Sequence, residues 1–180
     1  MMQRIKVLLM LRRGFLARRA EHLDDARNYF AQAVSISRRI GSKRLLVRAL
    51  KGCAQIERDS GRPAESLPYY EEAVSHCREI GDRMWLAHTI RHLGDANQDV
   101  DELSRAEECY REALSLYRRS RSVRLGDLAN AVRPFAILKE RLGDRSAAIE
   151  LWTEAHELYS SIKMQAGIDE SASHIEKLRA

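Results

Sequence analysis

Proline, cysteine and aromatic residues are all scarce in this chain of 180 residues, which contains three prolines, three cysteines and 6% aromatic side chains. With so little proline and an abundance of alanine, leucine, arginine and glutamate, the composition favours helices over strands. The cysteines are odd in number and include no Cys-x-x-Cys pair, which argues against a disulfide framework. We therefore expect reduced thiols in a cytoplasmic protein, because disulfides are rare in that compartment.

A long apolar run is also missing. The uninterrupted run near the N-terminus, Val7–Leu11, is shorter than the core of a secretory signal, and Arg12 and Arg13 follow it without a small-residue cleavage site. An arginine-rich start also suits a transit peptide, but these residues fall into the repeat register described below. No stretch approaches the roughly 20 apolar residues that span a bilayer, so the sequence predicts a soluble protein without a membrane segment.

Charged residues are abundant, with a moderate positive excess. The chain has 31 Lys and Arg residues against 26 Asp and Glu residues, which gives a net charge of +5 and a pI of 9.3. This balance is compatible with acidic partners and does not require nucleic acid. Most of the basic residues are arginines, which is typical of a bacterial genome rich in GC.

The short motifs of phosphate and acyl chemistry are absent from the sequence. It contains no GxxxxGK[ST] loop, no GxGxxG after a strand and no GxSxG elbow. No pair of carboxylates stands out from the many solvated ones. We therefore expect no catalytic activity and no cofactor.

The chain repeats itself with a period close to 40 residues. A triad of a small, an aromatic and a small residue occurs four times, and consecutive triads start 40, 40 and 42 residues apart. A further small residue precedes every triad by twelve positions. Such a shared register indicates a repeat architecture. The triads are Ala26/Phe30/Ala33, Ser66/Tyr70/Ala73, Ala106/Tyr110/Ala113 and Ala148/Trp152/Ala155, and the preceding small residues are Gly14, Ala54, Gly94 and Ala136.

Each copy has the pattern of two helices joined by a turn. Apolar residues recur at i, i+3, i+4 and i+7 in both halves of a copy. Turn residues separate the halves; Pro63 suits the first turn of a helix and Asp144 suits an N-cap. Two helices pack closely where small residues stand at their crossing, so the triads predict antiparallel helix pairs. A large residue in place of a triad alanine would overpack that crossing.

These columns resemble the tetratricopeptide repeat, with its aliphatic, small, turn, alanine, aromatic and alanine positions. The glycine of the family after the first helix is present as Gly61 and Gly143, whereas Glu21 and Asp101 depart from it. The usual period is 34 residues, and a period near 40 is similar to the longer variety found in kinesin light chains and bacterial regulators. The proline that ends the second helix in the family is replaced by Arg38, Arg78, Arg118 and Ser160.

The resemblance implies an all-α, right-handed superhelical array within a single domain, 1–180. We expect helix pairs over approximately 7–42, 43–82, 83–122 and 127–164, followed by a capping helix over 166–179. In that helix Ala172, Ile175 and Leu178 are the expected packing residues, and Pro134 is expected to kink or locally open the helix that contains it.

The resemblance also implies a concave groove lined by the first helix of each pair. Because guanidinium groups grip carboxylates, a basic groove predicts a protein–protein interaction module or scaffold that binds a peptide or partner helix, with acidic ligands favoured. The alternative is a solvated surface without a ligand. The predicted groove residues are Arg12, Arg19, Arg48, Lys51, Gln55, Arg58, His88, Arg91, His92, Asp95, Asn130 and Arg133.

Two other readings of the groove are weaker. His88 and His92 are spaced i, i+4 with Asp95 beyond them, which suits zinc, but Thr89 stands where a hydrolytic HExxH site needs glutamate. We therefore read the histidines as polar groove residues and expect no metal. A nucleic-acid-associated regulatory module is the alternative function, and it is disfavoured because Phe15 alone provides an aromatic face for base stacking in the groove.

Apolar residues near the N-terminus suggest assembly. Leu8, Leu11 and Phe15 stand where other copies have polar residues, and Met84, Trp85 and Leu86 add apolar surface near a loop. Such surface is usually covered by a partner. We expect a homo-oligomer through the N-terminal helix pair, or an upstream segment that covers the same residues.

Overall fold

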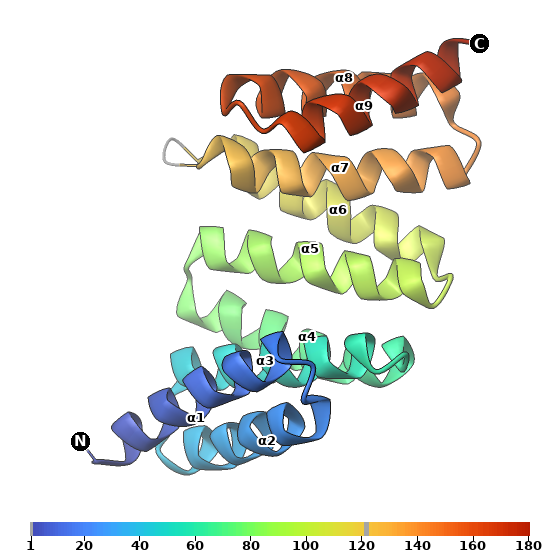
Figure 1. Cartoon of the computed structure of the whole chain (residues 1–180). Helices are drawn as coiled ribbons and strands as arrows, with labels where there is room; N and C mark the ends of the chain where they lie inside the picture. Colours follow the sequence, from blue (N-terminus) through green and yellow to red (C-terminus); the bar gives the residue numbers. More distant parts are fainter. Residues whose placement is uncertain (1, 121–122) are drawn as a thin grey trace.

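A computed structural model gives the structure of the chain, and it describes residues 2–120 and 123–180. These residues form helices joined by short connections, and consecutive helices pack as antiparallel pairs in an elongated array (Figure 1). The all-α array predicted from the repeats is confirmed. The helices are α1 (Met2–Arg19), α2 (Leu23–Arg39), α3 (Lys43–Asp59), α4 (Pro63–Ile80), α5 (Arg83–Asp99), α6 (Leu103–Arg118), α7 (Leu125–Arg141), α8 (Arg145–Ser161) and α9 (Gln165–Arg179).

Two predicted boundaries fall outside the described residues. These are residues 121–122, where the third predicted repeat ends, and residue 1 of the predicted domain 1–180. Within the described ranges, no helix is long and apolar enough to cross a membrane.

The small residues of the repeat allow the helices to approach closely. Every triad residue is at most 1% exposed. A Cβ atom added to Gly14 of α1 would lie 2.8 Å from the ring of Phe30 in α2, and one added to Gly94 of α5 would lie 2.8 Å from Tyr110 in α6. The aromatic ring therefore occupies the space that the missing side chain leaves, and the triads are a packing pattern.

The turn between the two helices of a pair has the same backbone conformation whether or not it contains glycine. Gly61 and Gly143 have φ angles of 72° and 73°, and Glu21 and Asp101 have φ angles of 60° and 65°. Residues other than glycine rarely adopt this left-handed conformation because of the clash at Cβ. The departure from the family glycine at Glu21 and Asp101 thus changes the residue without changing the turn.

The helices of the structure can be compared with several local predictions about helix starts, Pro134 and Ala172. Pro63 opens α4, and the Asp144 side chain accepts a hydrogen bond from the Ala147 N–H, so both predicted helix starts are confirmed. α7 continues through Pro134 to Arg141, so the proline does not end the helix. In α9, Ala172 is exposed, and the expectation that it packs inward was wrong.

Packing in α9 shifts to neighbouring positions because its contact with α8 is very close. A Cβ atom on Gly167 would lie 2.4 Å from the Tyr159 ring of α8. Gly167 and Ser171, four residues apart, are the buried residues of this helix. Ile175 and Leu178 pack against the core as expected, although both stay partly exposed.

A row of Arg–Glu ion pairs joins the second helices of successive pairs. Its arginines are the residues that replace the family proline, where the helix continues instead of ending. Each pair is exposed, so each contributes less than about 1 kcal/mol to stability. The pairs are Arg38–Glu72 (2.7 Å), Arg78–Glu112 (3.1 Å) and Arg118–Glu154 (2.6 Å).

Candidate functional site

The first helices of the pairs form the surface on which the predicted site residues lie. In Figure 1, α5 and α7 lie in front of α6, and α9 lies in front of α8. Residues of α3, α5 and α7, together with Tyr110 of α6, line a cavity of about 350 Å³. The predicted site residues in its wall are Arg58, Arg91, Asp95, Asn130 and Arg133.

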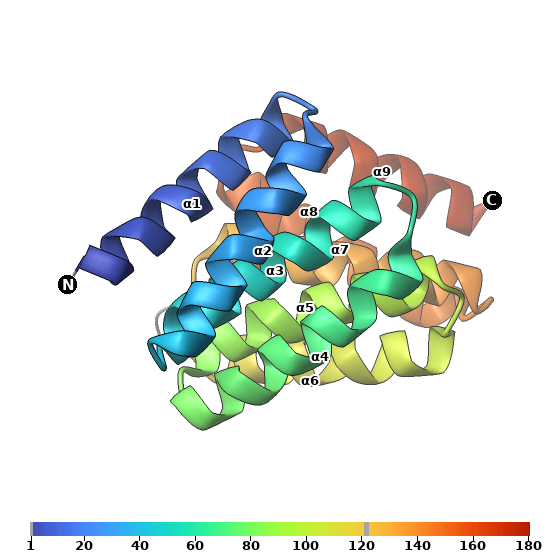
Figure 2. The same cartoon turned by 90° about the horizontal axis from the view of Figure 1, so that it is seen from below.

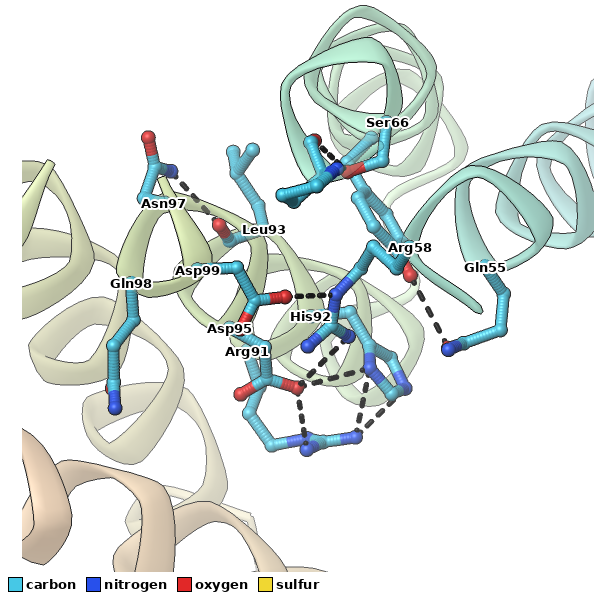
Figure 3. Close-up of polar contacts among 12 residues, drawn as sticks. Gln55, Arg58, Ser66, Arg91, His92, Leu93, Asp95, Asn97, Gln98 and Asp99 are labelled. Atoms are coloured by element: carbon cyan, nitrogen blue, oxygen red, sulfur yellow. Dashed lines mark hydrogen bonds and ion pairs between the residues drawn. The ribbon is translucent and has the colours of Figure 1, made fainter. Parts of the chain in front are cut away.

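Asp95 of α5 is the centre of a polar network in this wall (Figure 3). Its carboxylate accepts a hydrogen bond from Arg91 at 2.9 Å and lies 3.2 Å from Nδ1 of His92. The hydroxyl of Tyr110 also donates to it, at 3.0 Å. Burial by itself raises the pKa of Asp95, but the hydrogen bond from His92 and the charge of Arg91 outweigh burial and lower the pKa. Asp95 is therefore an anion that the protein itself neutralises.

Ion pairs at one register join successive first helices. Arg58 of α3 donates to Asp99 of α5 at 2.6 Å, and Arg18 of α1, 40 residues earlier, pairs with Asp59 of α3. Gln55 donates to the same Asp59 at 2.9 Å. Burial lowers the pKa of Arg58, but the hydrogen bond to Asp99 outweighs it and raises the pKa above its ordinary value.

In the C-terminal part of the site, the positive charge of an arginine is likewise neutralised by a carboxylate of the chain. Arg133 of α7 forms two hydrogen bonds with Glu170 of α9, at 2.7 and 2.5 Å. Asn130 accepts a hydrogen bond from the hydroxyl of Tyr159 at 3.3 Å. Three predicted site arginines, at positions 58, 91 and 133, therefore already bind carboxylates of the chain, which the sequence analysis did not anticipate.

Lys51 and Arg48 of α3 differ from these arginines. Among the described residues, no carboxylate lies within ion-pair distance of either side chain. Arg48 is exposed and Lys51 is partly buried, three residues apart on one helix face. Burial lowers the pKa of Lys51 to about 8, so its ammonium group is largely protonated at neutral pH without a partner.

Arg12 and Arg19 of α1 lie apart from the cavity. Both are exposed, and neither lines the wall formed by α3, α5 and α7. Arg12 has the register of Gly52 in α3, where an added Cβ atom would lie 2.3 Å from the Phe30 ring. No preceding helix lies beside α1 among the described residues, so Arg12 is exposed where Gly52 is buried.

The two histidines of α5 are neighbours, as their spacing predicts. The rings of His88 and His92 are 4.7 Å apart, and His92 also stacks on Tyr70 at 6.0 Å. Burial lowers the pKa of His88 to about 3 and that of His92 to about 4, so both rings are neutral at pH 7. The described residues contain no group of three or more His, Cys, Asp or Glu side chains arranged to hold a metal ion.

A second cavity, of about 470 Å³, lies next to His88. Its wall combines Trp85 and Met84 of α5 with residues of α3, α6 and α7. Arg44 of α3 lies over the Trp85 ring, with Cζ 5.7 Å from the ring centre. Trp85 and Met84 were predicted only as apolar surface, and four other wall residues were not predicted, because nothing in the repeat register brings them together. These are Arg44, Asp82, Tyr117 and Asp127.

The tetratricopeptide repeat family model matches residues 6–79 and 46–119, which together span more than half of the chain. No curated protein matches the chain in sequence.

Solved structures share the fold at low sequence identity. The apo form of RapI matches with a TM-score of 0.86 and 13% identity, over 92% of this chain and 60% of that one. A Rap protein complexed with competence and sporulation factor matches with a TM-score of 0.82 and 14% identity, over 92% and 46%. BtubC (BKLC) from P. vanneervenii matches with a TM-score of 0.62 and 16% identity, over 99% and 91%. The chain thus spans about half of each Rap protein, and these likenesses concern the fold alone.

Proposed function

This chain belongs to the tetratricopeptide repeat family, and we propose that it is a non-catalytic interaction module that binds an acidic peptide segment on the surface of α3 and α5. Proteins of this fold typically bind other proteins. The observation that carries the acidic specificity is the pair of cations on α3, Arg48 and Lys51, which have no carboxylate partner among the described residues. A carboxylate of a ligand would supply the missing partner and form charge-assisted hydrogen bonds.

The cavity beside these cations provides a place for an apolar ligand side chain. Lys51 is close enough to His88 to lower its pKa, and His88 lines the 470 Å³ cavity together with Trp85 and Met84. The ligand that fits both features is a peptide with a carboxylate next to an aromatic or aliphatic residue.

The test is a binding titration with a fluorescent peptide of about eight residues, too short for a stable helix, that contains glutamates and one tryptophan. We expect Arg48→Ala/Lys51→Ala to weaken binding about tenfold or more. The matched control is Arg105→Ala/Arg145→Ala, which removes two exposed arginines elsewhere and leaves binding unchanged. An equal loss of peptide affinity in both variants would contradict the proposal, because the binding would then depend on net charge and not on Arg48 and Lys51.

The alternative, a nucleic-acid-associated module, predicts a different dependence on salt. A complex with six or more phosphate contacts loses about 10³-fold or more in affinity between about 50 and 200 mM salt. The peptide complex, which depends on two cations and an apolar contact, should lose much less. Tight binding of a duplex or single strand with the steep dependence would favour the alternative.

A cytoplasmic location belongs to the same proposal and is tested by fractionation of cells that express the chain. Self-association through the N-terminal helix pair, expected from Leu8, Leu11 and Phe15, is a separate hypothesis that sedimentation equilibrium tests.

A further inference from the structure

The helix α1 is apolar on two opposite sides. The side centred on Leu11 is fully buried, although the sequence analysis expected Leu11 to be exposed together with Leu8 and Phe15, which are 45% and 40% exposed. The opposite side lies within a sector of about 60° of the helix. We call it the outer stripe of α1, and it consists of Met2, Ile5, Leu9 and Leu16, which are 51–81% exposed. Figure 2 shows α1 along one edge of the described chain.

The residues at the same repeat positions in later copies show what kind of contact this stripe can make. Leu9 and Leu16 precede Ala49 and Ile56 of α3 by 40 residues, and both of these are fully buried. The same register is buried again in α5, at Thr89 and Ala96, and in α7, at Ala131 and Leu138. Leu9 and Leu16 of the outer stripe therefore stand at repeat positions that are buried in α3, α5 and α7.

The burying element in the later copies is the preceding helix. Gly52 lies between Ala49 and Ile56 on the same face of α3, and an added Cβ atom there would meet the Phe30 ring of α2. This face of α3 thus packs against α2. The outer stripe of α1 presents the same face, but the described residues provide no helix to cover it.

The opposite end of the array does not share this property. Repeat arrays need a polar outer face on a terminal helix to remain soluble. α9 meets this requirement: Asp169, Ser173, Glu176 and Lys177 are exposed, and no large exposed apolar residue is found within the helix. Among the described helices, the exposed apolar stripe is therefore found on α1 and not on α9.

The charge of α1 decides which partner fits. The helix contains six cations and no carboxylate, and only Arg18 forms an ion pair within the described chain. At about 100° per residue, Arg12 and Arg13 lie within about 70° of the stripe on its two sides. A second copy of the chain would bring the same cations against these, whereas carboxylates on either side of an apolar row would pair with them.

We propose that the outer stripe of α1 binds an amphipathic helix of a partner protein whose apolar residues are flanked by glutamate or aspartate. This helix takes the place relative to α1 that α2 takes relative to α3. The surface is distinct from the groove of α3 and α5, so the proposal stands independently of the peptide site.

The test uses the full chain and a labelled amphipathic peptide about 18 residues long, with leucines at helical spacing and glutamates on both flanks. We expect saturable binding with a gain of helical circular dichroism, weakened about tenfold or more in Leu9→Ser/Leu16→Ser. The matched control Leu125→Ser/Leu142→Ser alters two leucines of similar exposure, 43% and 42%, and leaves binding unchanged. The groove variant Arg48→Ala/Lys51→Ala also binds as the wild type does.

A charge exchange provides the second measurement. We expect Arg12→Glu/Arg13→Glu to lose the glutamate peptide and to bind a peptide in which lysines replace the glutamates. Equal binding of both peptides by the wild type, or binding of neither, would overturn the proposal. It is also overturned if sedimentation equilibrium shows a dimer that Leu9→Ser/Leu16→Ser abolishes, or if the chain binds vesicles of phosphatidylglycerol through the stripe and ignores the glutamate peptide.

Discussion

Lys51, Arg91 and Arg133 occupy one register of the repeat in three successive copies, but their charges have different surroundings. Arg91 pairs with Asp95 four residues later in the same helix, and Arg133 pairs with Glu170 of α9, 37 residues later. The residues at the corresponding distances from Lys51 are Gln55 and His88, which are both neutral.

The comparison shows that a cation count does not locate a binding site. Arg91 and Arg133 pair with carboxylates of the chain, whereas Arg48 and Lys51 of α3 have no carboxylate partner among the described residues. Two neutral residues at the partner positions are enough to make this difference.

Loss of the carboxylate in the neutralised part should have the largest effect. Asp95→Ala leaves Arg91 without its carboxylate partner, whereas the Tyr110 hydroxyl still has Gln98 as an acceptor; breaking such a partly buried ion pair costs about 3 kcal/mol. Urea denaturation measures the free energy of unfolding. Glu72→Ala, which removes the carboxylate of the exposed Arg38–Glu72 pair, is the control and should cost less than about 1 kcal/mol. Equal costs would show that the Asp95 network is no more important than a surface pair.

The histidines of α5 should make the folded state sensitive to acid. Burial holds the pKa of His88 at about 3 and that of His92 at about 4, whereas both are near 6.5 in the unfolded chain. Between these values the unfolded chain binds protons that the folded chain does not, so stability falls as the pH is lowered below about 6.5. We expect a loss of about 4 kcal/mol between pH 6.5 and 4.5, which is about 2 kcal/mol for each ring. A His88→Asn/His92→Gln variant with an unchanged slope would contradict this assignment.

A carboxylate placed next to Lys51 should convert the α3 site into a neutralised one. Gln55→Glu introduces the i, i+4 arrangement that Arg91 and Asp95 have in α5. We expect the acidic octapeptide to bind about tenfold more weakly, because the new carboxylate competes for the ammonium group. Gln55→Ala removes the same amide without adding a charge and should bind the peptide normally. If both variants weaken binding alike, the amide itself contacts the ligand.

The lowered pKa of Lys51 predicts a pH dependence of the same order for the unmodified site. The free protein loses the ammonium charge as the pH rises through about 8, and a bound carboxylate raises the pKa again. Affinity for the acidic octapeptide should therefore be nearly full at pH 7 and fall up to about tenfold by pH 9. Lys51→Arg keeps its charge throughout this range and should bind without that decline. A parallel decline in Lys51→Arg would assign the titration to another group.

Much of the fold could be predicted from the sequence, because the features that determine it are local and recur in every repeat. The triads around Phe30 and Tyr110 and the small residues at Gly14 and Gly94 predicted the helix crossings, which the structure confirms. The periodicity of a segment is enough to predict a helix, and a small residue opposite an aromatic ring is enough to predict a close helix crossing. The turns at Glu21 and Asp101 were less readable, because the packed helices impose a left-handed backbone that those residues do not favour.

The sequence also placed polar residues on the correct helices, and five of the predicted residues line one cavity. Their pairing was not readable, because the chain contains 31 basic and 26 acidic residues and the partners of Arg58 and Arg133 are 41 and 37 residues away. The assignment of the twelve residues to a ligand remains a prediction.

By itself, the sequence determined the repeat, the helices and the close crossings, since these follow from side-chain size and spacing within one copy. Only the tertiary structure decided which charges are neutralised, which side of α1 the described residues leave uncovered and how the wall around Trp85 is assembled. Those properties depend on how far apart residues of different repeats lie in space. That distance is set by the packing of whole helices and not by any short segment of the chain.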